Sequence, residues 1–507
     1  MNPLPVLTSA HTERFRSAVA GALGLHFDDA KLAFLADVLQ RRLDDTGQGP
    51  DGYLSRLEGH SPGSEVGLVA VELTVSETSF FRNRDQFRAF SETVLPDRMS
   101  ARGTTRQLRI LSAGCASGEE AYSVAIAIRE AGLDRTWDVS ILGVDVNPAV
   151  LVKAATARYS AWALRETPPD IQQRWFTTDG RVFALDDRVR MAVTFEERNL
   201  AHNDPLLWQP DFYDVIFFRN VLMYFTREIA SAVIARLVRS LKTGGYLFLG
   251  HAETLRGLSN DFHLKHTHDT FYYQRKAQLG DSPLEAMAPA APTPPVIVEA
   301  VGESQSWVDA IRLATARIDA LTYPPRHVST PRLTPRRATP AWDLGVAVAL
   351  LREERFTEAL EAMQHFPAES GRDPDVLLLH AALLAHRGHL ADAEALCRRL
   401  LEVDELSAGA HYLLALCREG ASDPVSAAHH DQVAVYLDPG FAMPHFHLGL
   451  LARRSGDVVS ARRELEQAMV LLRREDGSRV LLFGGGFSRD TLVEICRTEL
   501  VTCGSRP

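Results

Sequence analysis

The sequence predicts an α/β fold with a helical N-terminal part and a doubly wound parallel sheet, followed by a linker and a separate all-α part. Two observations carry this prediction. Between residues 107 and 275, short β-rich runs alternate with helical runs, which is typical of a mostly parallel sheet covered on both faces. After residue 340, small residues recur every 34 positions, which indicates stacked helical hairpins.

The composition limits the class of protein. With 507 residues, of which 46% are hydrophobic, the chain is long enough for about three folding units. Its five cysteines are odd in number and contain no C-x-x-C pair, so they predict no disulfide framework or metal site and fit a reducing compartment. No apolar run reaches the roughly 18 residues of a membrane span. We therefore expect a cytoplasmic protein without direct membrane insertion.

The helical N-terminal part is predicted over residues 10–75. Within it, residues 28–43 form the clearest amphipathic helix, because apolar residues recur there at intervals of three to four positions. These residues are Leu32, Leu35, Leu39 and Leu43.

The sheet part is predicted over residues 76–275. Its expected strands are QLRILSA (107–113), DVSILGVD (138–145), YDVIFF (213–218) and GYLFLG (245–250). Helices are expected over 119–131 and 227–241, and a third begins at Asn147-Pro148, an Asn cap followed by Pro in the first turn. FHLKHTHDTFYYQ (262–274) predicts an antiparallel hairpin at the sheet edge.

A proline-rich linker is predicted over residues 276–340. Ten of the 26 prolines lie between 281 and 340, where they remove backbone donors and disfavour helix at the preceding residues. A short helical pattern from Trp307 to Leu321 is expected to interrupt it. The linker divides the chain into two parts.

Four tetratricopeptide repeats are predicted over residues 341–475. Two columns of small residues match the positions where the two helices of such a repeat approach closely. The columns are Ala347, Ala381, Ala415 and Gly449, and Ala359, Ala393, Ala427 and Ala461. The third repeat has the weakest pattern, because Arg418 replaces a large apolar residue and Pro424 stands near a helix start. An ordinary helical bundle is the alternative.

Residues 476–507 would form a cap, with a helix over 487–500.

The net charge of −10 is distributed unevenly. Residues 1–280 contain 32 basic and 34 acidic side chains, whereas residues 281–507 contain 23 and 31. Because nucleic acid attracts basic surfaces, the acidic half is not expected to bind it.

RILSAGCASGEEAYS (109–123) is the motif that indicates chemistry. A strand leads through a Gly114-to-Gly118 loop into a helix, as in loops that present backbone amides to a ligand. Glu119 and Glu120 either interact with the positive helix end or favour a cationic ligand such as a sulfonium. Asp145 ends the next strand, where an acidic residue is either a turn residue or accepts hydrogen bonds from ribose hydroxyls. Together these features favour an adenosyl cofactor.

Residues 15–275 resemble the CheR family, the S-adenosylmethionine-dependent methyltransferases that esterify glutamates of bacterial chemoreceptors. Six segments carry the resemblance in family order. They are LTVSETSFFRNRDQF (73–87), SAGCASGEEAYS (112–123), LGVDVNPAVLVKAATARYS (142–160), RNL (198–200), YDVIFFRNVLMYF (213–225) and LKTGGYLFLGHAET (241–254). The resemblance implies a Rossmann-like methyltransferase domain with an inserted antiparallel β-subdomain at about 170–197.

The resemblance also implies the functional residues. Its S-adenosylmethionine contacts fall on Ser76, Thr78, Arg82, Glu120, Asp145, Asn199, Leu200, Arg219 and Asn220. Tyr224 stands where the family places a tyrosine near the reacting methyl group, and Arg82 flanks the cleft; both are the expected catalytic residues. Core packing is the alternative role for Tyr224. Ser76 departs from the asparagine of the best-known members, which weakens that contact.

The expected function is the methylation of glutamate carboxylates in the cytoplasmic domain of a chemoreceptor, with a second protein partner on the repeats. The alternative is a scaffold that senses S-adenosylmethionine or acts mainly through its repeats. A third possibility is methylation of a small acid or of another protein.

Overall fold

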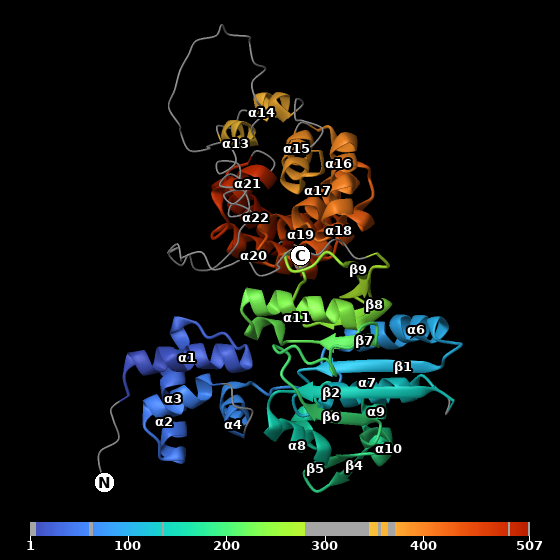
Figure 1. The fold of residues 1–507 in the computed structure, drawn as a ribbon. Helices are drawn as coiled ribbons and strands as arrows, with labels where there is room; N and C mark the ends of the chain where they lie inside the picture. The colour runs from blue at the N-terminus through green and yellow to red at the C-terminus, as the bar shows by residue number, and fades with distance from the viewer. Residues whose placement is uncertain are drawn as a thin grey trace, which may run out of the picture. The chain divides into compact units, whose positions relative to one another are not determined.

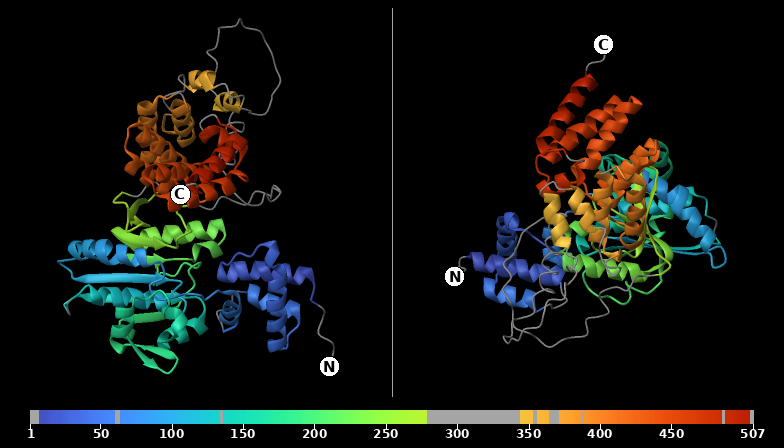
Figure 2. Two further views of the ribbon diagram at one scale, coloured as in Figure 1. Left: turned by 180° about the vertical axis from the view of Figure 1, so that it is seen from behind. Right: turned by 90° about the horizontal axis from the view of Figure 1, so that it is seen from above.

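The computed structural model describes residues 7–59, 64–133, 136–278, 344–352, 356–363, 371–386, 388–484 and 487–504 (Figures 1 and 2). They belong to two units, Met1–Pro283 and Leu284–Pro507. Most of the predicted linker, including the helix expected at 307–321, lies outside the described residues. Within the described ranges, none of the helices combines the length and apolar character needed to cross a bilayer.

The first unit begins with four helices: α1 (Ser9–Leu23), α2 (Leu32–Thr46), α3 (Pro50–Glu58) and α4 (Ser64–Leu73). The helix predicted from residue 28 starts later, because Asp29–Lys31 form a separate 3-10 turn. Leu35, Leu39 and Leu43 are buried, as their spacing predicted. Together with Phe15 and Val19 of α1 they form the core of this helical part.

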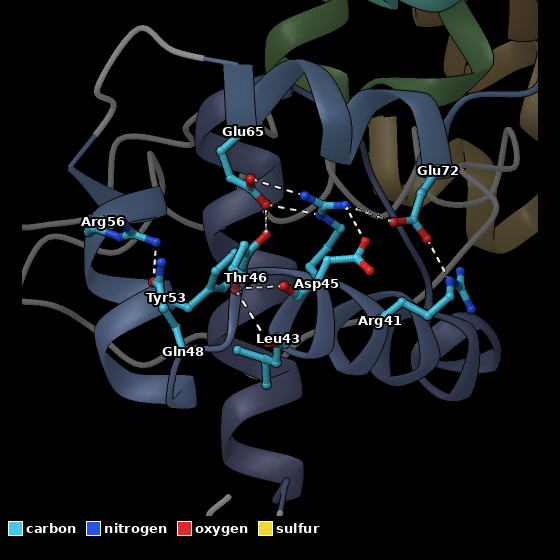
Figure 3. Close-up of polar contacts among 10 residues, drawn as sticks. Arg41, Leu43, Asp45, Thr46, Gln48, Tyr53, Arg56, Glu65 and Glu72 are labelled. Carbon is cyan, nitrogen blue, oxygen red and sulfur yellow. Dashed lines mark hydrogen bonds and ion pairs between the residues drawn. The ribbon is translucent and has the colours of Figure 1, made fainter.

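An ion-pair network centred on Arg42 joins α2, α3 and α4 (Figure 3). Arg42 is buried, and its guanidinium lies 3.0 Å from Glu65 and 2.9 Å from Asp45. Tyr53 of α3 donates a hydrogen bond of 2.8 Å to Glu65. The hydrogen bond to Glu65 raises the pKa of Arg42 against the effect of burial. This network stabilises the packing of the three helices.

Replacing Arg42 with methionine should lower the free energy of unfolding of the first unit by about 2 kcal/mol. Removing one partner of a fully buried pair costs roughly 3–5 kcal/mol, and here the carboxylates are partly exposed. Arg41→Met is the matched control, because Arg41 is 53% exposed and pairs with Glu72 at the surface; it should cost less than about 1 kcal/mol. Urea titration of the full chain measures both, and equal effects would contradict the structural role of Arg42.

A seven-stranded sheet forms the centre of the first unit, in the order β6-β2-β1-β7-β8-β10-β9. Strands β1, β2, β6, β7 and β8 pair in parallel, and β10 and β9 complete an antiparallel edge, which confirms the predicted hairpin. The bounds are β1 Gln107–Ala113, β2 Asp138–Asp145, β6 Val193–Glu197, β7 Tyr213–Phe218, β8 Leu241–Leu249, β9 Phe262–Thr267 and β10 Thr270–Arg275.

Helices connect these strands as the alternating pattern predicted. They are α7 (Glu119–Glu130), α8 (Pro148–Thr156), α9 (Pro169–Trp175), α10 (Asp187–Arg190) and α11 (Arg227–Ser240), whereas α5 (Arg84–Ala89) and α6 (Leu95–Ala101) precede β1. The side chain of Asn147 accepts hydrogen bonds from the amides of Ala149 and Val150, so the predicted Asn cap of α8 is present. The crossover through α7 steps from β1 to β2, and that through α11 steps the opposite way, from β7 to β8. Right-handed crossovers therefore place α7 and α11 on opposite faces, and the sheet is doubly wound.

The small antiparallel sheet differs from the prediction of residues 170–197. It consists of β3 (Arg158–Ser160), β5 (Val182–Leu185) and β4 (Phe176–Asp179), in that order. Residues 193–197 instead form β6, which pairs in parallel with β2 in the main sheet. The three-residue β3 is too short for a recognisable strand pattern, which explains the difference at the start.

The second unit consists of helical hairpins, as the 34-residue period predicted. The hairpins are α13 (Leu344–Arg352) with α14 (Phe356–Met363), α15 (Pro374–His386) with α16 (Leu390–Val403), α17 (Ala408–Gly420) with α18 (Pro424–Leu437), and α19 (Ala442–Ser455) with α20 (Val458–Leu472). The seven alanines of the two columns are fully buried. A Cβ atom on the eighth column member, Gly449, would lie 2.6 Å from Leu465. Close helix approach therefore explains the columns. The helices α21 (Gly477–Phe483) and α22 (Arg489–Gly504) follow.

The third hairpin is regular, although its sequence pattern is the weakest. Pro424 occupies the first turn of α18, where its missing amide donor costs nothing, and Asp423 caps that helix through the amide of Ser426. Arg418 pairs with Glu394 of the preceding hairpin. Polar contacts at this position thus replace the usual apolar packing.

A buried histidine, His447 of α19, contributes to the same region. Its Nε2 lies 2.7 Å from Glu419, and its Nδ1 lies 2.7 Å from the fully buried Asp431. Burial acts to lower the pKa of His447, but hydrogen bonds to both carboxylates outweigh it and raise the pKa to about 9. The imidazolium therefore lies between the two carboxylates inside the hairpin stack, where burial raises the pKa of Asp431 to about 7.

The stability of the second unit should fall as the pH rises from 7 to 9. The folded-state pKa of His447 exceeds its ordinary value of 6.5, so the stabilisation is complete below that value and disappears as the pH passes about 9. The loss should reach at most about 3 kcal/mol. Chemical denaturation at both pH values should show this loss in the wild type and in the control His429→Gln, but not in His447→Gln. A loss that persists in His447→Gln would refute the assignment.

Candidate functional site

A cavity lies at the carboxyl ends of the parallel strands in the first unit. Its wall includes residues that follow β1, β2, β6 and β7, together with residues of the helical part. It contains about 730 Å³ of non-protein space, part of which is open solvent. The step between β1 and β7 is the point where the strand order reverses, which is where doubly wound sheets bind ligands.

The loop between β1 and α7 forms one side of the cavity. Gly114 has a φ of 77°, and a Cβ atom there would lie 2.4 Å from Val221 in the loop after β7. The amides of Gly114 and Cys115 donate to the carbonyl of Val144, at 2.8 and 3.0 Å, which fixes the loop against β2. Only glycine at position 114 therefore lets the two loops meet at this distance.

Asp145 lies at the end of β2 and lines the cavity. Its Oδ2 accepts a hydrogen bond of 2.9 Å from the amide of Ala116, and its Oδ1 accepts one of 2.9 Å from Asn147. Burial raises the pKa of Asp145, whereas these backbone amides act to lower it. The amides hold the carboxylate in a fixed orientation, and each oxygen retains a lone pair for a hydroxyl of a bound ligand.

The loop after β7 brings Asn220 and Tyr224 into the same cavity wall. Asn220 has a φ of 59°, a left-handed conformation that is uncommon for residues other than glycine. The buried carboxylate of Glu253 accepts hydrogen bonds from the amides of Asn220 and Gly250, at 2.7 and 2.8 Å. Glu253 therefore stabilises the turn that presents Asn220 and Tyr224. It belongs to the segment LKTGGYLFLGHAET (241–254), but no sequence pattern predicted a role for it.

The helical part closes another side of the cavity. Leu25 forms a β-bridge with Phe225, and the amide of His26 donates a hydrogen bond of 2.8 Å to the carbonyl of Tyr224. The side-chain amide of Asn199 donates to the carbonyl of Ala22 at 2.8 Å. Asn199 and Leu200 both line the cavity. The side-chain nitrogen of Asn199 thus joins α1 to the loop after β6.

Glu120, Arg219 and Arg82 form a second group of predicted residues. Glu120 accepts a hydrogen bond of 2.7 Å from Ser112, and its other oxygen lies 3.2 Å from Arg219. Arg219 also donates to the carbonyl of Arg82 at 2.6 Å. Burial raises the pKa of Glu120 and lowers that of Arg219, and their mutual attraction opposes both shifts. None of the three lines the cavity as it stands.

Two other predicted residues are also separate from the cavity wall. Ser76 is exposed and Thr78 is half-buried, although their neighbours Thr74 and Val75 line the cavity. The following turn is anchored by Glu166, which accepts hydrogen bonds from the hydroxyl of Ser79 and the amide of Asn83, at 2.8 and 3.1 Å.

The remaining polar groups of the motif have structural partners. Glu119 accepts a hydrogen bond of 2.8 Å from Ser117. Cys115 is buried, and burial followed by the charge of Asp145 raises the pKa of its thiol well above the ordinary value. A neutral buried thiol is a packing residue, as expected. The wall residues Leu25, His26 and Phe27 could not be predicted, because no local sequence pattern relates them to a loop 200 positions away.

The cavity fits the adenosyl cofactor that the motif predicted. Asp145 can accept hydrogen bonds from ribose hydroxyls, and side chains such as Phe27, Leu200 and Phe225 supply apolar wall for a purine ring. The carboxylate of Asp145 in the cavity wall would also suit a cofactor that carries a positive charge. Within the described ranges, no group of three or more His, Cys, Asp and Glu side chains could hold a metal ion.

Comparison with known proteins supports this interpretation. The family described as CheR methyltransferase, SAM binding domain, matches residues 76–271. Chemotaxis protein methyltransferase 2 of Vibrio cholerae is 33% identical over 275 residues, which cover 53% of this chain and 94% of that protein. The probable biofilm formation methyltransferase WspC of Pseudomonas putida is 29% identical over 458 residues, which cover 90% of this chain and 97% of that protein. The second similarity therefore extends into the helical repeats.

Proposed function

Because this chain belongs to the CheR family of S-adenosylmethionine-dependent methyltransferases, we propose that it methylates glutamate side chains in the cytoplasmic domain of a chemoreceptor. The observation that carries the proposal is a sequence similarity: 275 residues of this chain align with 94% of the length of a chemotaxis methyltransferase. The position of Asp145 in that cavity supports it. Loss of one receptor carboxylate changes the charge of a helical bundle and thereby its signalling state.

We also propose that the signalling pathway is related to biofilm formation. The relatives named chemotaxis methyltransferases cover about half of this chain, 53% in two cases. The two relatives named probable biofilm formation methyltransferases each cover 90% of it. The arrangement of a catalytic unit followed by repeats is thus shared with the second group.

The chemistry needs little acid or base catalysis from the protein. When bound, S-adenosylmethionine supplies a methyl carbon on a sulfonium sulfur, which a carboxylate oxygen attacks in line. The glutamate of the substrate has an ordinary pKa of about 4.3, so it is already ionised at neutral pH. The protein contributes orientation and partial exclusion of water. We propose that Asp145, Asn199, Leu200 and Asn220 hold the cofactor, with Glu120 and Arg219 behind them.

The charge change during the reaction limits the role of Arg82. Attack neutralises the negative carboxylate and the positive sulfonium together. Positive charge held against the carboxylate would therefore stabilise the ground state more than the transition state. Arg82 is half-buried at the turn that Arg219 holds through its carbonyl. We propose that it orients the glutamate by hydrogen bonding, and that Ser76 and Thr78 join the site when the cofactor binds.

Transfer of a radioactive methyl group to purified cytoplasmic receptor fragments tests the proposed function. We expect labelled protein whose label is released by mild base, because methyl esters hydrolyse and methylated amines do not. Cofactor binding without transfer to any receptor of the same genome would refute the enzyme and favour a scaffold. Base-labile label on other targets would refute the receptor as substrate.

Tyr224→Phe should retain cofactor affinity and lower kcat by about 10-fold or more. The phenol lines the cavity while its backbone carbonyl is held by His26, so removal of the hydroxyl leaves the loop in place. One lost hydrogen bond in the transition state is worth about 1.5 kcal/mol. Calorimetry and initial rates measure the two quantities. Wild-type kcat in this variant would show that Tyr224 only packs.

A further inference from the structure

The inner face of the helical repeats is occupied by a segment of the same chain. The name inner face is used here for the side on which the first helices of the hairpins, α13, α15 and α17, contact this segment. After α20 the chain does not proceed directly to α22, which packs back on α20. It first runs through α21, which contacts α13 and α15 of the first two hairpins (Figure 1). Residues 475–483, here named the α21 segment, therefore cross the face where the first helices lie.

An aromatic pocket receives Phe483 at the end of the α21 segment. The Phe483 ring lies 5.0 Å from that of Phe441 and 5.8 Å from that of Tyr412, both in edge-to-face geometry. The hydroxyl of Tyr412 donates a hydrogen bond of 3.1 Å to the carbonyl of Phe483. Phe483 is 3% exposed. The pocket thus binds both the ring and the backbone of this residue.

An acidic pocket receives Arg479, four residues earlier. Its guanidinium lies 2.6 Å from Asp438 and 4.0 Å from the centre of the Phe441 ring. Glu475, which belongs to the α21 segment itself, lies 3.4 Å from the same guanidinium and accepts a hydrogen bond from the amide of Ala442. Arg479 is 6% exposed. In an ion pair at the protein surface the guanidinium would remain in contact with solvent. Because the guanidinium of Arg479 is buried with its carboxylate partner, the contact is specific.

Gly409 of α17 supplies a third observation. A Cβ atom at this position would lie 3.0 Å from the Phe483 ring and 3.1 Å from Leu378. The residues 34 positions before and after Gly409 are Asp375 and Met443, so the repeat itself does not require a small residue there. The glycine instead makes room for Phe483 and its pocket.

We propose that the inner face of the repeats is a peptide-docking site for a helical segment with arginine and an aromatic residue four positions apart, and that the α21 segment is its resident occupant. A partner that presents this pattern binds by displacing the α21 segment. The acidic balance of residues 281–507, 23 basic against 31 acidic side chains, suits a basic partner. Because a tethered segment competes at an effective concentration of about 1 mM, partner binding stays weak until the segment is released.

Fluorescence anisotropy with a labelled synthetic peptide of residues 474–484 tests this proposal on the full chain. Two substitutions release the resident segment while leaving the receiving pockets on the other helices unchanged: Phe483→Ala and Arg479→Glu. We expect the peptide to bind both variants at least about 10-fold more tightly than the wild type. Val459→Ala is the control, because Val459 is 81% exposed on α20 and should leave binding at the wild-type level.

Two further arms locate the binding site. Adding Tyr412→Ala to Phe483→Ala should abolish binding, and a peptide with alanine in place of the phenylalanine should not bind any variant. Folded release variants that fail to bind the peptide would overturn the proposal. Failure of both release variants to fold, judged by circular dichroism, would also overturn it, because the α21 segment would then be an integral part of the core.

Discussion

Asp145→Ala is expected to lower the affinity for S-adenosylmethionine by at least about 100-fold. The carboxylate lies in the cavity wall and is held by the amides of Ala116 and Asn147, so it is oriented before the cofactor arrives. Hydrogen bonds to a charged group contribute about 1.5–3 kcal/mol each, and two of them to ribose hydroxyls account for a 100-fold change. Isothermal titration calorimetry with S-adenosylmethionine measures it.

Asp138→Ala is the matched control for this experiment. Asp138 begins the same strand, β2, at the end opposite Asp145, and its 59% exposed side chain pairs with Arg109. This variant should bind the cofactor with wild-type affinity. Similar losses in both variants would mean that the β2 carboxylates act through general electrostatics or folding, which would contradict a specific ribose contact.

Glu253→Ala should lower kcat by about 100-fold. The carboxylate accepts hydrogen bonds from the amides of Asn220 and Gly250, and its removal leaves these buried donors unpaired, at a cost of about 1–3 kcal/mol each. The left-handed turn at Asn220 then relaxes and moves Tyr224. Misplacement of a site residue by about 1 Å is sufficient for a 100-fold loss. Initial rates with a receptor fragment measure the effect.

Rescue by a conservative substitution separates positioning from general stability. Both strong hydrogen bonds reach Oε2 of Glu253, so Glu253→Gln can keep them through its single carbonyl oxygen and should recover most of the rate. Glu228→Ala is the control, because Glu228 is exposed in the first turn of α11, after the same loop. Equal loss in the Ala and Gln variants would show that the negative charge of Glu253 matters, not its acceptor geometry.

The sequence predicted those features that depend on local patterns. Strand β7 has six buried residues in succession, and the apolar run over residues 215–218 identifies it. The hairpin columns were predictable because close helix packing demands small side chains at fixed intervals, as Ala393 and Gly449 show. Asp145 could be placed at the cavity because parallel strands end on one side of a sheet.

Features that depend on distant contacts were not predictable. The β-bridge between Leu25 and Phe225 joins residues 200 positions apart, so no window of sequence contains both. The role of Glu253 depends on a left-handed backbone at Asn220, which residue type does not reveal. The α21 segment was expected to be part of a cap, because its contacts with α13 and α15 reach back over a hundred residues. Arg418 made the third repeat look irregular in the sequence. The residue that it pairs with, Glu394, lies in another hairpin, so no pattern within the repeat shows the pairing.

Tandem mass spectrometry of a receptor fragment, after incubation with the full chain and S-adenosylmethionine, tests the central claim most directly. We predict a mass increase of one methylene group on defined glutamate residues of the cytoplasmic helical bundle. The same fragment should be modified far less by the Asp145→Ala variant at a limiting cofactor concentration, because the proposed ribose contact is removed. Modification of other residue types, or of glutamates at equal levels with wild type and Asp145→Ala, would contradict the account.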